Sequence, residues 1–408
     1  MASENIFEMK SLPLLKFFSN GKFKIKTHRK HFKSFSKMII NKLSIINFKN
    51  HDGKSFEFSP QINCFVGNNG VGKTNILDAL HYLSVGKSFL GNSDLNNIKI
   101  QNSRFEIQED LEIADFFSIE AEIQNGEKED IIKILQPKDS KKVIKKNDKS
   151  YDRIADHIGY LPSVMISPYD SNLISDSGES RRKFLDAMIS QTDSGYLFNL
   201  IQYQKTVQQR NALLKYFAKN RTFDKDSLEI YNDPISNFGT EIFEKRKDFV
   251  EKLNPIVQKF YEIISGGKEK VEVLYESHLF EHDFPTLLSE NIDKDRALTY
   301  TSKGVHKDDL LFRMNGNLIK KIGSQGQQKS FLIALKLAQI NRIKELTEKS
   351  PVLLLDDIFD KLDDTRVSQL IELVNKENFG QIFITDTHRE RTENVVKRIS
   401  EESRIFEV

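Results

Sequence analysis

The sequence predicts an α/β fold whose two halves are separated by an inserted helical lobe. Three observations predict it. An apolar run at residues 62–66 leads through a glycine-rich turn into a helical pattern at 75–83. A second apolar run, at 352–355, ends in two aspartates. Between these segments, roughly 120 residues carry apolar side chains at helical spacing.

Length and composition limit the classes of protein to which the chain can belong. Its 408 residues can bury a large core, and a charged fraction of 29% with a mean hydropathy of -0.48 indicates a soluble cytoplasmic protein. No apolar run approaches the ~20 residues of a membrane span. The single cysteine, Cys64, lies in a predicted buried strand, which excludes disulfides or a cysteine-based zinc site within one chain.

The first 37 residues differ in charge from the rest of the chain. They contain nine Lys or Arg and two Glu, a net charge of +7, so that the remainder carries about −5 of the whole-chain charge of +2. Phenylalanines interleaved with these basic residues are compatible with a nucleic-acid-binding arm. We favour the simpler interpretation that residues 1–37 precede the native start at Met38.

The first α/β half, predicted to span 38–175, reads mainly as strands. Strands are expected at 39–48, 55–58, 62–66, 106–113, 117–123, 131–135 and 142–146, with a turn at 50–54. Asn147 and Asp148 predict a tight hairpin. A lysine run has two readings, a DNA contact or, as we expect, a solvated hairpin face. It comprises Lys138, Lys141, Lys142, Lys145, Lys146 and Lys149.

Residues 176–297 are predicted to form the helical lobe. Helices are expected at 180–191, 196–216 and 235–264, with a polar connector at 224–227. No sustained heptad pattern runs through them, which excludes a long coiled-coil arm.

Residues 298–408 are predicted to form the second α/β half. There we expect strands at 310–314, 352–355 and 381–385 and helices at 327–346 and 366–374.

The glycine-rich turn has the G-x-x-x-x-G-K-[ST] pattern of a P-loop, which cradles nucleotide phosphates. Its glycines allow backbone N–H groups and the following helix N-terminus to face phosphate oxygens. Lys73 is expected to reach the β- and γ-phosphates of ATP, and the Thr74 hydroxyl to bind Mg²⁺. The predicted nucleotide-binding residues are Gly67, Asn68, Asn69, Gly70, Val71, Gly72, Lys73 and Thr74.

Asp356 and Asp357 follow the apolar strand 352–355. Asp356 is expected to hold Mg²⁺ beside Thr74, and Asp357 to polarise an attacking water. Together with Lys73, the two aspartates form the predicted catalytic set. A strand ending in two aspartates is by itself weak evidence for a Mg²⁺-binding catalytic pair. A P-loop earlier in the chain makes that evidence strong. The alternative for Asp357 is a helix N-cap.

A third element, a Ser-Gln-Gly-Gln turn, opens the predicted helix before this strand. It presents a hydroxyl, backbone N–H groups and the positive end of the helix dipole, which suit a γ-phosphate. Because the P-loop holds its own chain's phosphates, the turn is expected to complete a site on a second subunit. A plain helix cap is the alternative. The predicted nucleotide-binding residues are Ser324, Gln325, Gly326 and Gln327.

In combination, these three motifs resemble those of ABC-type ATPase heads, the group that includes SMC proteins and the RecF family. Further segments along residues 38–408 resemble RecF motifs. They are 45–50, 86–89, 147–149, 166–170, 181–186 and 304–309. Leu90, Asp148 and Tyr169 depart from the family pattern, and Leu90 weakens any basic contact there. Arg181 and Arg182 are expected to join the lobe to the ATPase core or to form surface ion pairs; His306 also reads as a satisfied core histidine.

The resemblance implies an ABC-type ATPase head that uses ATP and Mg²⁺ and hydrolyses ATP weakly, as a conformational switch. ATP would close a homodimer, with Asp363 in the D-loop at its interface contacting nucleotide. Asp386 and His388 both lie at the switch position that senses γ-phosphate; which of the two does so is left open, and His388 also reads as a surface residue. The resemblance also implies binding to duplex DNA and single-strand/duplex junctions. Cooperation with RecR and RecO in loading RecA, in replication restart and in the SOS response is implied as well.

Two other classes share the nucleotide motifs. An SMC-like chromosome ATPase is disfavoured because the inserted lobe is too short for an arm. The soluble ATPase subunit of an ABC transporter is disfavoured because the lobe is larger than transporters use.

Overall fold

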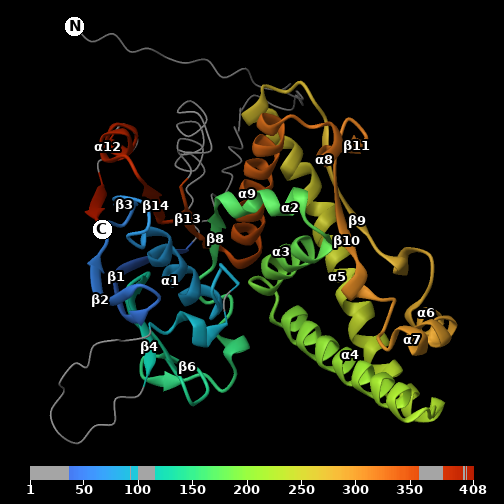
Figure 1. Cartoon of the computed structure of the whole chain (residues 1–408). Helices are drawn as coiled ribbons and strands as arrows, with labels where there is room; N and C mark the ends of the chain where they lie inside the picture. The colour runs from blue at the N-terminus through green and yellow to red at the C-terminus, as the bar shows by residue number, and fades with distance from the viewer. Residues whose placement is uncertain (1–35, 92, 100–114, 358–379, 398–399, 401) are drawn as a thin grey trace, which may run out of the picture. The chain divides into compact units, whose positions relative to one another are not determined.

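The computed structural model describes residues 36–91, 93–99, 115–357, 380–397, 400 and 402–408 (Figure 1). Four predicted features lie wholly or mostly outside these ranges: the tail 1–37 (of which only 36 and 37 are described, as the start of a strand), the strand at 106–113, the helix at 366–374 and Asp363. Within the described ranges, no helix combines the length and apolar character that crossing a membrane requires.

Five parallel strands form the sheet that carries the nucleotide motifs. Their order is β15-β3-β14-β13-β8. They are β3 (Ile62–Val66), β8 (Ser163–Ile166), β13 (Val352–Leu355), β14 (Ile382–Asp386) and β15 (Ser403–Glu407). A single strand, β14, therefore separates the strand before the P-loop from the strand before the paired aspartates.

Both faces of this sheet are buried, which explains the continuous apolar runs of its strands. Leu353 faces a core that is shared with the helical lobe and with α9 (Gln325–Thr347). Its neighbour Leu354 faces a second core with α1 (Lys73–Val85) and the antiparallel sheet. The helix after the P-loop and the helix after the Ser-Gln-Gly-Gln turn therefore pack in different cores.

A second, mainly antiparallel sheet has the order β12-β1-β4-β5-β6-β7, with β2 also paired to β1. Its strands are β1 (Ser36–Phe48), β2 (His51–Glu57), β4 (Phe116–Asn125), β5 (Lys128–Pro137), β6 (Val143–Lys146), β7 (Lys149–Ser150) and β12 (Lys349–Ser350). The predicted turn at 50–54 is wrong, because β2 already begins at His51. Its mostly exposed polar residues read as a loop in the sequence. The hairpin at Asn147 and Asp148 is confirmed, with φ of 48° and 63°.

The helices of the inserted segment are α3 (Gly178–Ser190), α4 (Ser194–Asn220), α5 (Lys225–Ser265), α6 (Phe284–Glu290) and α7 (Ile292–Leu298). The long helices α4 and α5 pack side by side (Figure 1). The predicted connector at 224–227 is wrong, because Asp224 caps α5. Its carboxylate accepts hydrogen bonds from the backbone N–H groups of Asp226 and Ser227, so these polar residues form the first helical turn.

A three-stranded sheet crosses the predicted lobe boundary at residue 297. Its strands are β9 (Val271–Glu276), β10 (Asp309–Met314) and β11 (Asn317–Leu318), in the order β11-β10-β9. The domain bounds at 175 and 297 remain predictions.

The remaining described helices are short. They are α2 (Asn172–Ser175), α8 (Ile319–Ile322), α12 (Arg389–Lys397), η1 (Asp94–Asn97), η2 (Ile154–Asp156), η3 (Pro168–Ser171), η4 (His278–Phe280) and η5 (Val305–Lys307).

Candidate nucleotide-binding site

The glycine-rich turn connects β3 to α1. Gly72 is the N-cap of α1 and has a φ of 106°, in the left-handed region that favours glycine. A Cβ on Gly72 would lie 2.4 Å from the side-chain nitrogen of Asn50. Both the backbone conformation and this close approach therefore require glycine here.

Lys73 is almost fully buried in the turn, with 5% of its surface exposed. Its Nζ donates hydrogen bonds to the carbonyl oxygens of Gly67 at 2.8 Å and Asn68 at 2.9 Å. These bonds hold the ammonium group against the loop, where it can exchange a carbonyl for a charged phosphate oxygen, the stronger acceptor.

Thr74, Asp356 and Thr385 form a hydrogen-bonded cluster. The hydroxyls of Thr74 and Thr385 both donate to Asp356 Oδ1, at 2.9 and 2.7 Å. Burial raises the pKa of Asp356, and the two hydroxyl donors partly oppose that rise. A carboxylate beside a hydroxyl supplies the hard oxygen ligands that Mg²⁺ prefers. The structure thus brings together the two residues that were predicted to bind the metal.

Asp357, the predicted water-polarising residue, has a φ of 44°. Aspartate tolerates this left-handed conformation better than most residues. Its backbone N–H donates a hydrogen bond to Thr385 Oγ1 at 3.0 Å. The alternative role of Asp357 as a helix cap involves residues beyond 357 that the structure does not describe.

The Ser-Gln-Gly-Gln turn forms a reciprocal capping box at the start of α9. Ser324 Oγ accepts a hydrogen bond from the Gln327 backbone N–H, and Gln327 Oε1 accepts one from the Ser324 backbone N–H. Gln327 Nε2 also donates to Glu269 at 2.9 Å. Gln325 is exposed. Ser324 therefore does cap the helix, and nucleotide binding by Gln327 would require its amide to change partners.

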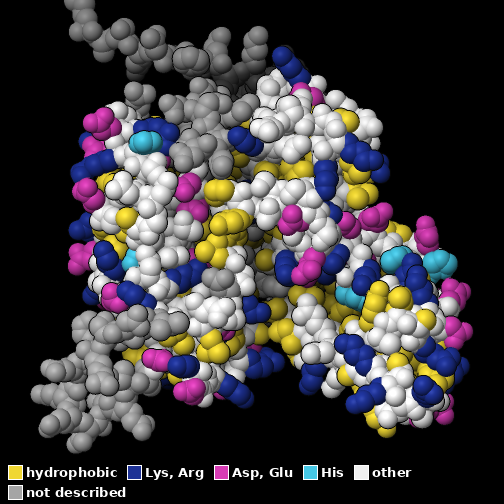
Figure 2. All heavy atoms as spheres, in the orientation of Figure 1, with side chains coloured by type: hydrophobic (Ala, Val, Ile, Leu, Met, Phe, Trp, Pro, Cys, Tyr) yellow, Lys and Arg dark blue, Asp and Glu magenta, His cyan; other side chains and the backbone are white. Residues whose placement is uncertain are grey.

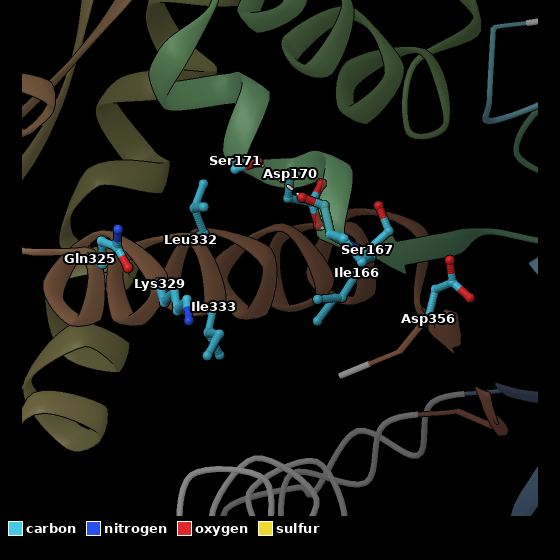
Figure 3. A pocket seen from close by; sticks show the side chains of 10 residues that line it. Ile166, Ser167, Asp170, Ser171, Gln325, Lys329, Leu332, Ile333 and Asp356 are labelled. Carbon is cyan, nitrogen blue, oxygen red and sulfur yellow. Dashed lines mark hydrogen bonds between the residues drawn. The ribbon is translucent and has the colours of Figure 1, made fainter. Parts of the chain in front are cut away.

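A pocket of about 300 Å³ lies between the first turns of α9 and the segment after β8 (Figure 3). Ile166, Leu332 and Ile333 give it apolar walls. Figure 3 places Gln325 at one end and Asp356 at the other. Gln325 of the Ser-Gln-Gly-Gln turn, from here on called the signature turn, and Asp356 of the same chain thus lie at opposite ends of one cavity.

Of the two candidate γ-phosphate sensors, Asp386 already has hydrogen-bond partners away from the paired aspartates. The Asp386 carboxylate is buried and accepts hydrogen bonds from Arg391 at 2.6 Å and from Thr392 at 2.7 Å. His388 is exposed. The side chain that reaches Asp356 from β14 is Thr385, which the sequence reasoning missed because a threonine in an apolar strand carries no distinguishing signal.

The β1–β2 turn supports the P-loop from outside, which the sequence reasoning also missed. Asn50 Nδ2 donates to the Val71 carbonyl at 3.0 Å, and Asn50 Oδ1 accepts from Asn75 at 2.7 Å. His51 Nε2 lies 3.1 Å from the Gly72 carbonyl. Burial lowers the pKa of His51, which favours the neutral ring as a partner for that carbonyl.

The motifs at 181–186 and 304–309 meet each other rather than the nucleotide site. Arg181 forms two hydrogen bonds with the Asp309 carboxylate, each of 2.7 Å, joining α3 to β10. The buried Arg246 on α5 pairs with both Asp186 and Asp308. Arg182 donates to the Asp308 carbonyl, and the ring nitrogens of His306 contact the Tyr203 hydroxyl and the Thr301 carbonyl. His306 is thus a partly buried histidine with hydrogen-bond partners at both ring nitrogens.

Half of the six lysines in the run form ion pairs within the chain. The pairs are Lys138 with Asp115, Lys142 with Asp94, and Lys146 with Asp130. On the face seen in Figure 2, basic and acidic side chains are interspersed. The local pairing supports the reading of a hairpin surface over a dedicated basic patch.

Comparisons with known proteins agree on one family. The family described as the RecF/RecN/SMC N terminal domain matches residues 39–406. The DNA replication and repair protein RecF of Flavobacterium johnsoniae is 53% identical over 369 residues, covering 90% of this chain and 99% of its own. RecF of Phocaeicola vulgatus is 44% identical, with coverages of 91% and 96%.

Solved structures give the same result. The recombination mediator protein RecF of the RecFOR pathway, in a structure described as RecF-ATP, matches with a TM-score of 0.77, 30% identity and coverages of 89% and 95%. An Smc head bound to part of ScpA matches with a TM-score of 0.50 and 16% identity, a likeness of fold alone. The predicted ABC-type ATPase head is confirmed, and the comparison favours RecF over the SMC-like alternative.

Proposed function

The chain belongs to the RecF family of DNA replication and repair proteins, and from this premise we propose that it is an ATP-dependent DNA-binding protein of recombinational repair. The hydrogen bond from Thr74 to Asp356 carries the nucleotide part of the proposal. It joins the P-loop to the paired aspartates in the arrangement that a metal–nucleotide complex needs.

ATP and Mg²⁺ fit the residues present. Thr74 and Asp356 would hold the metal, because a hydroxyl can keep donating to the carboxylate while its lone pair faces a cation. Lys73 and the backbone N–H groups of 67–74 would bind the phosphates. When bound, Mg²⁺ neutralises charge that develops on the phosphate oxygens. Asp357 would polarise the attacking water, giving a weak ATPase that works as a switch.

A second copy of the chain would complete the site. In one chain, Gln325 lies at the far end of the pocket from Asp356. Ser324, Gln325 and Gly326 open α9, so their backbone N–H groups lie at the positive end of its dipole. We infer that they receive the γ-phosphate held by a partner, so that ATP closes a homodimer. Asp363, predicted at the same interface, lies outside the described residues.

The DNA part of the proposal rests on the family. We propose that the protein acts in the cytoplasm. There the closed dimer would bind duplex DNA and the single-strand/duplex junctions at DNA gaps. With RecR and RecO it would help to load RecA, supporting replication restart and the SOS response. Because the body of the chain carries a net charge of about −5, DNA contacts must come from local basic clusters, and affinity should fall steeply with salt.

Binding to gapped DNA tests this proposal. Gapped duplex, blunt duplex and single-stranded DNA would be titrated with the protein and Mg-ATP, in low salt and at roughly physiological salt. Preferential binding of gapped duplex, with stimulated hydrolysis, is expected. If no DNA binds at low salt while ATP is still hydrolysed, the repair function fails and the ATPase stands.

A further inference from the structure

Thr385 lies on β14, which pairs both with the strand before the P-loop and with the strand before the paired aspartates. It lies opposite Phe65 of β3, with β13 on the other side. Its side chain is fully buried. The hydroxyl contacts two groups at once: the Asp356 carboxylate at 2.7 Å and the backbone N–H of Asp357 at 3.0 Å.

The direction of both hydrogen bonds follows from chemistry. A backbone N–H can only donate, so Thr385 Oγ1 accepts from Asp357. The single hydroxyl hydrogen is then directed to Asp356 Oδ1, which also receives the Thr74 hydroxyl. Among the described residues, no hydrogen bond reaches Asp356 Oδ2. The two hydroxyls therefore fix the carboxylate through one oxygen and leave the other to face a metal or its water.

We propose that Thr385 is a positioning residue for ATP hydrolysis, which sets the metal-facing carboxylate of Asp356 and the left-handed backbone of Asp357 with one hydroxyl. The inference deepens the proposed ATPase function and rests on it. Thr385 holds the two carboxylates in fixed relation, so that a metal bound at Asp356 and a water held by Asp357 keep their relative positions.

The surroundings of β14 support Thr385 over its neighbours. Asp386, the next residue, has its carboxylate held by Arg391 and Thr392. His388 is exposed. Of the three, only Thr385 makes a side-chain contact with the paired aspartates, and its contact distances are those of ordinary hydrogen bonds.

Two substitutions separate hydroxyl chemistry from packing. Thr385→Val keeps the shape and removes the hydroxyl, whereas Thr385→Ser keeps the hydroxyl. Thr392→Val is the matched control, because Thr392 is equally buried and donates to Asp386 Oδ2 at the same 2.7 Å, away from the paired aspartates. Thermal unfolding of each variant reports folding independently.

Mg²⁺ dependence is the main measurement. The half-saturating Mg²⁺ concentration would be measured both for binding of a fluorescent ATP analogue and for hydrolysis, alongside kcat and KM. For Thr385→Val we expect the half-saturating Mg²⁺ concentration to rise, or kcat to fall, by roughly ten- to a hundredfold. This is the usual effect of removing a group that orients a metal ligand. Nucleotide binding in EDTA should stay unchanged, because Lys73 and the loop supply it. Thr385→Ser should recover most of the loss.

Two results would overturn the inference. One is a Thr385→Val protein that is folded and matches the wild type in Mg²⁺ dependence and kcat. The other is an equal loss in Thr392→Val, which would indicate general loosening of β14. If the wild type binds Mg-ATP but does not hydrolyse it, the proposed ATPase function fails, and the Mg²⁺ dependence of binding alone decides the role of Thr385.

Discussion

Thr74 Oγ1 donates a hydrogen bond to Asp356 Oδ1 across 2.9 Å, although 282 positions separate the two residues. The parallel sheet makes this contact, because β14 alone lies between β3 and β13 and all three strands end at the same edge. Residues that follow these strands must therefore converge.

Replacing Lys73 by alanine should weaken ATP binding roughly ten- to a hundredfold, the range expected for losing hydrogen bonds to a charged group. The fold should survive, because among the described residues Lys73 Nζ bonds only to carbonyls of its own loop. Calorimetric titration with ATP would measure the loss. Lys219→Ala, at an exposed position near the end of α4, is the control. Equal affinity in Lys73→Ala and wild type would contradict the assigned role.

Mixing two inactive variants should restore hydrolysis if the site is shared between subunits. Lys73→Ala disables the P-loop, and Ser324→Arg blocks the signature turn that we propose faces a partner. A mixed dimer combines both defects in one site and leaves the other intact. We therefore expect measurable ATPase activity in the mixture and almost none in either variant alone. An inactive mixture in which mixed dimers are detected would rule out the shared site.

Gly72→Ala should destabilise the protein more than a glycine substitution in an open turn. The new Cβ would meet the Asn50 side chain at 2.4 Å, and the alanine would have to adopt the φ of 106°. Gly126→Ala is the control, since its φ is also positive, at 64°, and no atom lies within 4 Å. We expect about 1–3 kcal/mol for Gly72, the usual cost of local strain, and about 1 kcal/mol for Gly126. Denaturant unfolding measures both, and equal losses would argue against the clash.

Asp295→Ala should strongly destabilise the lobe. It leaves the Arg210 guanidinium buried without its carboxylate, and both side chains are at most 1% exposed. The expected loss in unfolding free energy is about 3–5 kcal/mol. Asp293→Ala, on the same helix, breaks an exposed pair with Arg296 and should cost less than about 1 kcal/mol. A similar small loss for both variants would show that the buried pair is not a stability determinant.

His306 should make stability depend on pH. Burial lowers its pKa to about 4, below the 6.5 of an exposed histidine, so the unfolded chain binds a proton more readily. Stability is therefore lost as the pH falls from 6.5 towards 4, by about 2 kcal/mol at pH 5 for this residue alone. Unfolding of wild type and His306→Gln would be compared at pH 7.5 and pH 5, with exposed His282→Gln as control. An unchanged pH dependence in His306→Gln would refute this assignment.

Local patterns made the nucleotide motifs and most elements predictable. The P-loop, the paired aspartates and the start of α9 depend on residues close in sequence, so their turns and caps could be read directly. Errors arose where polar residues belong to regular structure. The exposed strand β2 and the first turn of α5 both looked like loops, because composition does not reveal pairing with β1 or capping by Asp224.

Side-chain partners were the part that could not be predicted. The sequence does not show that the Gln327 amide donates to Glu269, which lies in the loop after α5. It also leaves the γ-phosphate sensor open between Asp386 and His388, and does not show that Arg391 and Thr392 hold the Asp386 carboxylate. Each partner is available only after the chain has folded.

By itself, the sequence determined that this chain has a P-loop, a signature turn and two aspartates at a strand end, because each is a local pattern with its own chemistry. The tertiary structure alone decided which side chains meet at the sheet edge. It placed Thr385 against Asp356 and Asp357, and Asn50 against the P-loop. Such contacts depend on strand order and on the close packing of distant segments, which no local pattern encodes.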